Sequence, residues 1–271
     1  MKSFIDKNFP SFSRNYRQFR DNYKFKRLKP YSTIYGFDLY GDSDLDTSRE
    51  ESFESSTFKE YFQKVDMFLD VGANVGLFSC LAAKYDLDIL SFEPHPNNLQ
   101  CLYRNIKMNE IRRIEVFPIA ISNEPGIMEF FGGGQGATLV KGWAGIESNY
   151  QTLVPVNTLD NLAYERCRSK TLLIKVDIEG NEYPMLSGAT NLLNMDPSPT
   201  WILEHCLTEN FGGDVNPYFK QVFEVFWNAG YKAYVIEDPL REVKISDVER
   251  WIENKKRDFG YVNYLFSKEA L

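Results

Sequence analysis

Apolar and polar positions follow a regular rhythm from residue 65 to the end of the chain. Short apolar runs alternate with stretches of helical periodicity at about 75–85, at 96–109 and at 217–229. A further helical stretch follows the run at 171–177 and reaches about residue 194. Seven of the runs have the length and residue types of buried strands, and they span residues 67–71, 88–92, 114–117, 171–177, 200–205, 231–236 and 261–267. The alternation predicts a Rossmann-like α/β fold, with a mostly parallel sheet covered by helices on both faces.

Two stretches interrupt this rhythm. Residues 126–159 predict a hairpin and loop, in which the glycines at 132–134 and 136 fit either a hairpin turn or a mobile cover. Trp143 and Tyr150, in the same insertion, fit either a stacking surface for a sugar ring or packing under the loop. Residues 38–54 carry seven acidic residues among Ser and Thr, which predicts a solvated connection.

The first thirty residues have a pattern of their own. Aromatic residues recur there at alternating steps of three and four, the spacing of one helical face, at Phe9, Phe12, Tyr16, Phe19 and Tyr23. One interpretation is an amphipathic helix that docks on the chain's own body or on a second copy, which would make a homo-oligomer. The other is a basic aromatic surface for an anionic glycan, nucleic acid or membrane. We therefore expect an N-terminal helical arm and acidic connection over 1–60, followed by one domain over 61–271.

Charge is divided unevenly between these two parts. The net charge is −7, but residues 1–30 hold nine Lys or Arg against two Asp, so they carry +7 and the remainder carries −14. An acidic body of this kind disfavours nucleic acid as a partner. No apolar run approaches the roughly 18 residues of a membrane span. The four cysteines are widely spaced without a CxxC pair, so we expect reduced thiols and a cytoplasmic protein.

The clearest local signal is LDVGANVG at residues 69–76. A strand ends there at Asp70, the chain turns through Gly72, Asn74 and Gly76, and a helix begins at once. Glycines let the backbone pass close to a ligand, and the first turn of the helix offers free N–H groups. Glu93 ends the next strand, twenty-one residues after Gly72. A carboxylate at that place can accept hydrogen bonds from ribose hydroxyls, so the two strand ends predict a nucleoside site.

The spacing of the turn separates two cofactor classes. The glycines read G-x-x-x-G, whereas dinucleotide enzymes use G-x-G-x-x-G. Asp70, directly before the turn, would repel a pyrophosphate but suits the cationic amino-acid end of S-adenosyl-L-methionine. The turn and the two acids therefore indicate S-adenosyl-L-methionine, and an NAD-dependent oxidoreductase is the weakest alternative.

Four blocks resemble, in order and spacing, the FkbM family of S-adenosylmethionine-dependent methyltransferases. They are FLDVGANVGLFSCLAA, ILSFEPHPNNLQCLYRNIKMN, VPVNTLDNL and LLIKVDIEGNEYPMLSGA, within residues 66–206. The resemblance implies the class I methyltransferase fold: a seven-stranded sheet with one antiparallel strand and helices on both sides. It also implies O-methylation of a sugar hydroxyl on a glycan, a glycolipid or a glycosylated natural product, so the expected partner is a carbohydrate acceptor.

The resemblance also implies where the cofactor lies. The methionine part would contact Asp70, Gly72, Asn74 and Gly76, and Glu93 would hold the ribose. Ala120 and Ser122, after the third strand, would lie beside the adenine. Asp177, in the block KVDIEGNE, would face the methyl group.

Four ionisable residues fall at the ends of adjacent predicted strands and are candidates for catalysis: Asp177, Glu179, Glu204 and His205. One of them would act as general base towards the acceptor hydroxyl, and His205 is the first choice. The alternative for His205 is a structural role at the strand end. Alternatively, Asp177 and a glutamate would hold a divalent metal such as magnesium. Lys175 lies inside an apolar strand, so we expect its side chain to extend to solvent or to pair with a neighbouring carboxylate.

Two further functions stay open at this point. The basic aromatic arm would suit an RNA ribose O-methyltransferase, which the acidic body disfavours. A non-catalytic assembly partner could keep the fold and use the arm for contacts, but the presence of Asp70, Glu93 and Asp177 speaks against it.

Overall fold

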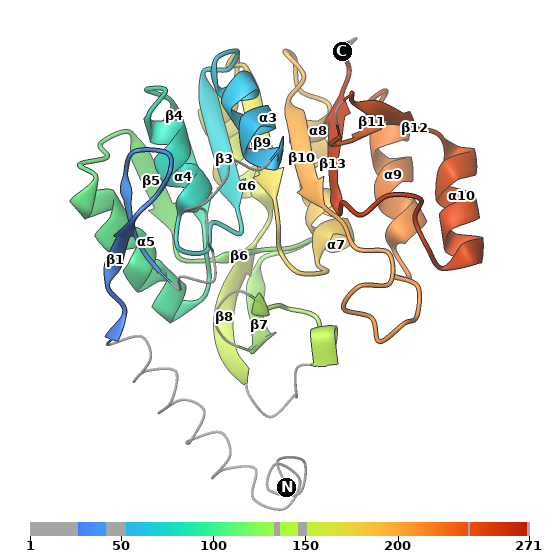
Figure 1. Cartoon of the computed structure of the whole chain (residues 1–271), viewed down its shortest axis with the longest axis horizontal. Helices are drawn as coiled ribbons and strands as arrows, with labels where there is room; N and C mark the ends of the chain where they lie inside the picture. The colour runs from blue at the N-terminus through green and yellow to red at the C-terminus, as the bar shows by residue number, and fades with distance from the viewer. Residues whose placement is uncertain (1–26, 42–52, 133–135, 146–150, 238, 270–271) are drawn as a thin grey trace, which may run out of the picture.

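The computed structural model describes residues 27–41, 53–132, 136–145, 151–237 and 239–269 (Figure 1). A large sheet forms the centre, in the strand order β12-β11-β13-β10-β9-β3-β4-β5. Its eight strands are β3 (Met67–Val71), β4 (Asp88–Phe92), β5 (Ile114–Phe117), β9 (Leu172–Val176), β10 (Thr200–Glu204), β11 (Lys232–Val235), β12 (Arg241–Val243) and β13 (Asn263–Ser267). All seven predicted strands are present.

The eighth strand corrects the predicted count of seven. β12 has three residues and pairs antiparallel with β11 at the edge of the sheet. A segment this short contains no alternation from which a strand can be predicted. The other strands follow the expected directions, because β3 pairs in parallel with β4 and β9, β10 continues in parallel, and β13 runs antiparallel between β10 and β11.

Helices cover both faces of the sheet, as predicted. One face packs against α6 (Leu159–Cys167), α7 (Glu182–Ser187), α8 (Thr190–Leu193), α9 (Phe219–Asn228) and α10 (Ile245–Asn254). The other packs against α3 (Phe53–Phe62), α4 (Leu77–Ala83) and α5 (Pro96–Met108). The single helix expected up to residue 194 is two short helices, α7 and α8. None of the helices in the described ranges is both long and apolar enough to cross a membrane.

The prediction of a solvated connection over 38–54 is wrong at both of its ends. β1 (Pro30–Ser32) and β2 (Asp38–Tyr40) form an antiparallel pair, and Leu39 is fully buried. The Asn105 side chain on α5 fixes β2, because it accepts a hydrogen bond from Tyr40 N at 2.6 Å and donates to Tyr40 O at 3.0 Å. The last residues of the stretch begin α3. Residues 42–52, and the predicted helical arm at 1–26, lie outside the described residues.

The predicted hairpin in the insertion is present with a different partner strand. β7 (Gly126–Phe131) pairs antiparallel with β8 (Gln151–Asn157), and β6 (Ala120–Ile121) completes a three-stranded sheet. A hairpin turn at the glycines 132–136 would have placed the partner strand directly after it. Thr138, in that position, forms only a single bridge to Phe131. This small sheet lies below the central strands of the large one in Figure 1.

Aromatic packing attaches α3 to the sheet. The Phe58 side chain is fully buried, and its ring centroid lies 4.4 Å from that of Phe78 and 6.2 Å from that of Phe68.

We expect Phe58→Ala to lower the free energy of unfolding by about 3–5 kcal/mol, through lost contacts and the cavity left behind. Chemical denaturation measures the change.

A matched control is Tyr103→Ala on the outer surface of α5, where the side chain is 50% exposed. It should change stability by no more than about 0.5 kcal/mol. Equal effects of the two substitutions would mean that α3 is not part of the cooperative core.

Candidate active site

A cavity with an empty volume of about 550 Å³ opens at the carboxyl ends of β3, β4 and β9, beside the small sheet. It lies at the edge where open α/β sheets bind ligands. Six predicted site residues line it: Gly72, Asn74, Glu93, Ala120, Asp177 and Glu179. The sequence motif and the block KVDIEGNE thus meet at one place, although they are about a hundred residues apart.

Gly72 brings three strand ends together. Its backbone has φ +84, and its N–H donates to the carbonyl of Phe92, the last residue of β4, at 3.0 Å. A Cβ atom at this position would stand 1.8 Å from the carbonyl oxygen of Asp177, at the end of β9. Only glycine permits both the positive φ and this approach. The turn therefore sets the spacing between β3, β4 and β9 at the cavity.

Glu93 is buried at the cavity wall, 4% exposed. Its Oε2 accepts a hydrogen bond from Asn74 N at 2.8 Å, and its Oε1 accepts from His95 N at 2.7 Å and Asn98 Nδ2 at 3.3 Å. These bonds occupy three of the roughly four acceptor positions of a carboxylate and leave one at Oε2. Burial raises the pKa of Glu93 to about 7, against the opposing effect of the His95 and Asn74 N–H groups.

Asp70 and Lys175 lie beneath the cavity, opposite each other on β3 and β9. The Lys175 ammonium is 3.2 Å from Asp177 Oδ2 and 3.8 Å from Asp70 Oδ1, which confirms the predicted pairing. Ser79 Oγ donates to Asp70 Oδ2 at 2.5 Å. Burial raises the pKa of Asp70, and the charge of Lys175 opposes that rise. For Lys175, burial lowers the pKa, but Asp177 and Asp70 outweigh it and raise the pKa above its usual value.

Gly76 and Ser122 support the site from outside the cavity wall. Gly76 is the N-cap of α4, and a Cβ there would lie 2.4 Å from Leu102 Cδ1. Ser122 is 1% exposed, and its N–H donates to Asn157 O at 3.0 Å. Asp70, Gly76 and Ser122 do not line the cavity. Their direct contact with a cofactor stays a prediction.

Glu179 is held in the cavity wall by residues of the insertion. Trp143 Nε1 donates to Glu179 Oε2 at 2.7 Å, and Thr138 Oγ1 donates to the Glu179 carbonyl at 2.6 Å. Burial raises the pKa of Glu179 to about 7, and the charge of Asp177 adds to the rise. Trp143 is only 3% exposed, so of its two predicted roles the structure has the packed one. Tyr150 lies outside the described residues.

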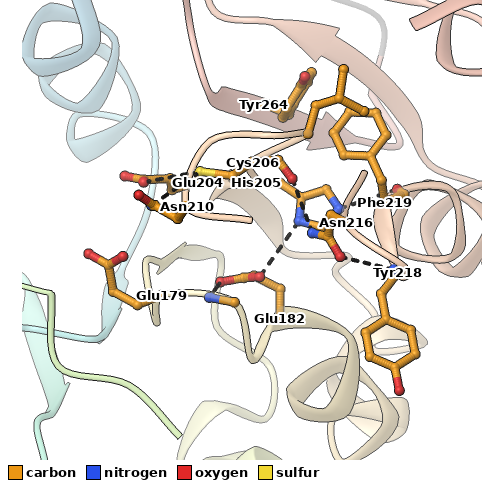
Figure 2. A network of polar contacts seen from close by, with 12 residues as sticks. Glu179, Glu182, Glu204, His205, Cys206, Asn210, Asn216, Tyr218, Phe219 and Tyr264 are labelled. Carbon is orange, nitrogen blue, oxygen red and sulfur yellow. Dashed lines mark hydrogen bonds and ion pairs between the residues drawn. The ribbon is translucent and has the colours of Figure 1, made fainter. Parts of the chain in front are cut away.

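Glu204 and His205 are neighbours in the chain but point to opposite sides of the sheet. Glu204 follows Ile202 on the face that carries Lys175, and burial, then the charges of Asp177 and Glu179, raises its pKa to about 8. His205 is 1% exposed and stacks on Phe219, with ring centroids 5.0 Å apart (Figure 2). The cavity wall does not include His205, which favours the structural alternative for this residue.

Sequence reasoning missed Thr138 and Asn181. Asn181 lines the cavity and donates from Nδ2 to Ile121 O at 3.0 Å, which joins the turn after β9 to the small sheet. Its place between Gly180 and Glu182 in the resembling block was a signal for it. Thr138 contacts Glu179 across 41 residues of chain, and no local pattern indicates such a contact.

The magnesium alternative has no support in this geometry. Within the described part of the chain, no three His, Cys, Asp or Glu residues gather in a way that could hold a metal ion. The acids at the cavity are instead paired with Lys175 or with hydrogen-bond donors.

We expect Gly72→Ala to lower the free energy of unfolding by about 2 kcal/mol or more, because it adds a strained φ and a collision with the Asp177 carbonyl. Gly136→Ala is the matched control, since nothing lies within 4 Å of a Cβ at that position. Thermal unfolding of both variants tests the difference, and a stable Gly72→Ala protein would contradict the close approach.

Solved structures similar to this chain include several methyltransferases. A methyltransferase FkbM from Methylobacillus flagellatus is 19% identical, with 75% of this chain and 49% of that chain covered and a TM-score of 0.37. A putative O-methyltransferase from Klebsiella pneumoniae is 14% identical, with 91% and 94% covered and a TM-score of 0.47. The precorrin-6y C5,15-methyltransferase of Geobacter metallireducens is 11% identical, with 73% and 78% covered and a TM-score of 0.42.

This chain spans about half the length of the Methylobacillus protein. A comparison with curated proteins found no match. The strand order and the helices on both faces are those expected of the class I methyltransferase fold, with one added edge strand. The family model of the methyltransferase FkbM domain matches residues 70–233, from the end of β3 into β11. The chain belongs to the FkbM family of methyltransferases.

Proposed function

We propose that the protein is an S-adenosylmethionine-dependent O-methyltransferase that acts on a sugar hydroxyl of a glycan, a glycolipid or a glycosylated natural product. One observation carries the proposal. The cavity has Glu93, Asp177 and Glu179 in its wall, and none of the described residues that line it is basic. Such a wall attracts a ligand with cationic groups and repels a pyrophosphate.

The residues of the cavity fit S-adenosylmethionine. Glu93 keeps one acceptor position for a ribose hydroxyl, and the buried Oδ1 atoms of Asn74 and Asp70 accept no hydrogen bond from the described residues. The cofactor would supply a methyl group on a sulfonium sulfur. Gly72, Asn74 and Glu93 would hold its nucleoside and amino-acid parts, and Ala120 offers an apolar surface beside them.

Proton removal from the acceptor falls to Glu179 in this proposal. Its pKa is raised to about 7, and a general base works best when its pKa lies near the working pH. Trp143 occupies Oε2 and leaves Oε1 available. Lys175 fixes Asp177 beside it, so Asp177 would orient the acceptor hydroxyl. Glu204 would act on Glu179 through its charge.

A sugar is the acceptor that these features support best. A neutral polyol can exchange its water hydrogen bonds for the carboxylates of the cavity. RNA would bring phosphates against the same acids, which costs electrostatic free energy. The FkbM resemblance points to sugar hydroxyls as well.

We expect affinity for S-adenosylmethionine to rise by about tenfold from pH 6 to pH 8, because the Glu93 carboxyl, with its pKa at about 7, loses its proton in this interval and the carboxylate is the better acceptor. Isothermal titration calorimetry measures the dependence. Glu93→Gln should bind more weakly and with a flatter pH profile. The same slope in that variant would assign the titration to another group.

A labelled-methyl transfer assay on a panel of sugars and glycans, with and without magnesium, tests the activity itself. Glu179→Gln and Asp177→Asn should each lower turnover by about a hundredfold or more, a larger effect than their loss of cofactor affinity. Glu165→Gln, an exposed acid on α6, is the control. Methylation of RNA in a salt-sensitive manner would replace the sugar acceptor, and failure to bind the cofactor would favour a non-catalytic partner.

A further inference from the structure

Glu182 and His205 face each other in the core behind the cavity, 3% and 1% exposed (Figure 2). We propose, on the basis of the function proposed above, that this buried pair is a positioning device that holds the turn at Glu179 and Gly180 in its active shape. His205 then serves the reaction without touching the cavity.

Three contacts hold His205, one through its backbone and two through its ring. Its backbone N–H donates to Val262 O at 2.8 Å, which continues the pairing of β10 with β13. The ring lies flat on Phe219, with 5° between the planes. Nε2 is 3.2 Å from the carbonyl oxygen of Phe219. Because a carbonyl only accepts hydrogen bonds, Nε2 carries the proton and donates to it.

The fixed ring leaves Nδ1 directed at Glu182. Nδ1 is 3.6 Å from Glu182 Oε2, and it has no hydrogen-bond partner among the described residues. A buried carboxylate is costly without compensating partners. Glu182 has one hydrogen-bond donor, the N–H of Gly180, which donates to Oε1 at 2.9 Å. His205 forms an ion pair with Oε2 when its ring carries a second proton, at Nδ1. Glu182 therefore links the end of β10 to the turn after β9.

The turn needs this support because its backbone is unusual. Glu179 has φ +55 and Gly180 φ +99, and residues other than glycine rarely adopt such values. A Cβ atom at residue 180 would lie 2.4 Å from the Trp143 ring. Trp143 and Thr138 hold Glu179 from the side of the insertion. Glu182 holds Gly180 through its backbone N–H, so the turn is fixed both by the insertion and by Glu182.

His205 is itself anchored to α9 through Phe219. Loss of Glu182 removes the acceptor of the Gly180 N–H, and loss of His205 removes the group that holds Glu182 in place. Glu179 would then relax towards common backbone conformations, and its carboxylate would leave its place in the cavity wall. His205 is a positioning residue on this account, and Glu179 remains the residue that contacts the acceptor.

The indole N–H of Trp143 provides a readout that does not depend on methyl transfer, because it donates to Glu179 Oε2. The chain has four tryptophans, so a ¹⁵N-labelled sample of the full chain gives four indole signals, and Trp143→Phe identifies the one concerned. We expect Glu182→Leu and His205→Leu to move this signal. Glu182→Gln keeps an oxygen acceptor for Gly180 N–H and should leave it in place.

Kinetics form the second arm. Glu182→Leu and His205→Leu should each lower kcat by about tenfold or more with little change in the acceptor KM, because a misplaced base loses orientation rather than binding. The double variant should lose no more than the worse single variant, since the two act as one unit. Glu182→Gln should stay within about threefold of the unchanged protein.

His205→Gln covers the case in which a leucine variant does not fold. Its amide can reach either Phe219 O or Glu182 but not hold both as the ring does, so the Trp143 signal should move in the same direction. A fall in kcat in the His205 variants with an unmoved Trp143 signal would overturn the proposal, because His205 would then affect turnover without acting through the turn. If the unchanged protein shows no methyl transfer but the Trp143 signal still responds to both leucine substitutions, the proposed function is wrong. The role of Glu182 and His205 in holding the turn then stands.

Discussion

The close approach of Gly72 to the Asp177 carbonyl is the constraint on which the site depends. It holds the carboxyl ends of β3 and β9 at backbone contact distance, where a single methyl group would stand 1.8 Å from an oxygen. The N–H of the same glycine donates to the carbonyl of Phe92, the last residue of β4. With three strand ends fixed, Glu93 and Asp177 fall on opposite sides of one cavity. Every other feature of the site is built on this spacing.

Charge is the second consequence of that geometry. Strand register puts Asp70 beside Lys175, and Lys175 reaches Asp177 at the strand end. One ammonium then faces several acids. Burial, and after it the charge of Asp177, raises the pKa values of Glu179 and Glu204. A cationic ligand in the cavity would reduce the repulsion between these acids. Part of the acid surplus of the body thus lies where such a ligand would bind.

The sequence predicts the strands, the motif turn and Glu93 because these follow from local periodicity and glycine chemistry. The opposite placement of Glu204 and His205 was also within reach, since strand alternation puts Glu204 with Ile202 and His205 with Leu203 on the other face. Trp143 and Glu179 are 36 residues apart, and no local pattern joins them. β2 was hidden among acidic residues, because its stability comes from Asn105 on α5 and the burial of Leu39.

The site also extends beyond the residues that match the family. α3 precedes the matched stretch of 70–233, yet its first turn brings Glu54 into the field of the cavity acids. Burial raises the pKa of Glu54, and the charges of Lys175 and Asp177 act on it in opposite directions. Phe58 fixes the helix through Phe78, whose ring lies 5.4 Å from the Lys175 ammonium. Because α3 contributes to both the packing and the electrostatics around Lys175, we expect a change in this helix to alter the charge around Lys175. The charge around Lys175 therefore depends also on a helix that lies outside the family match.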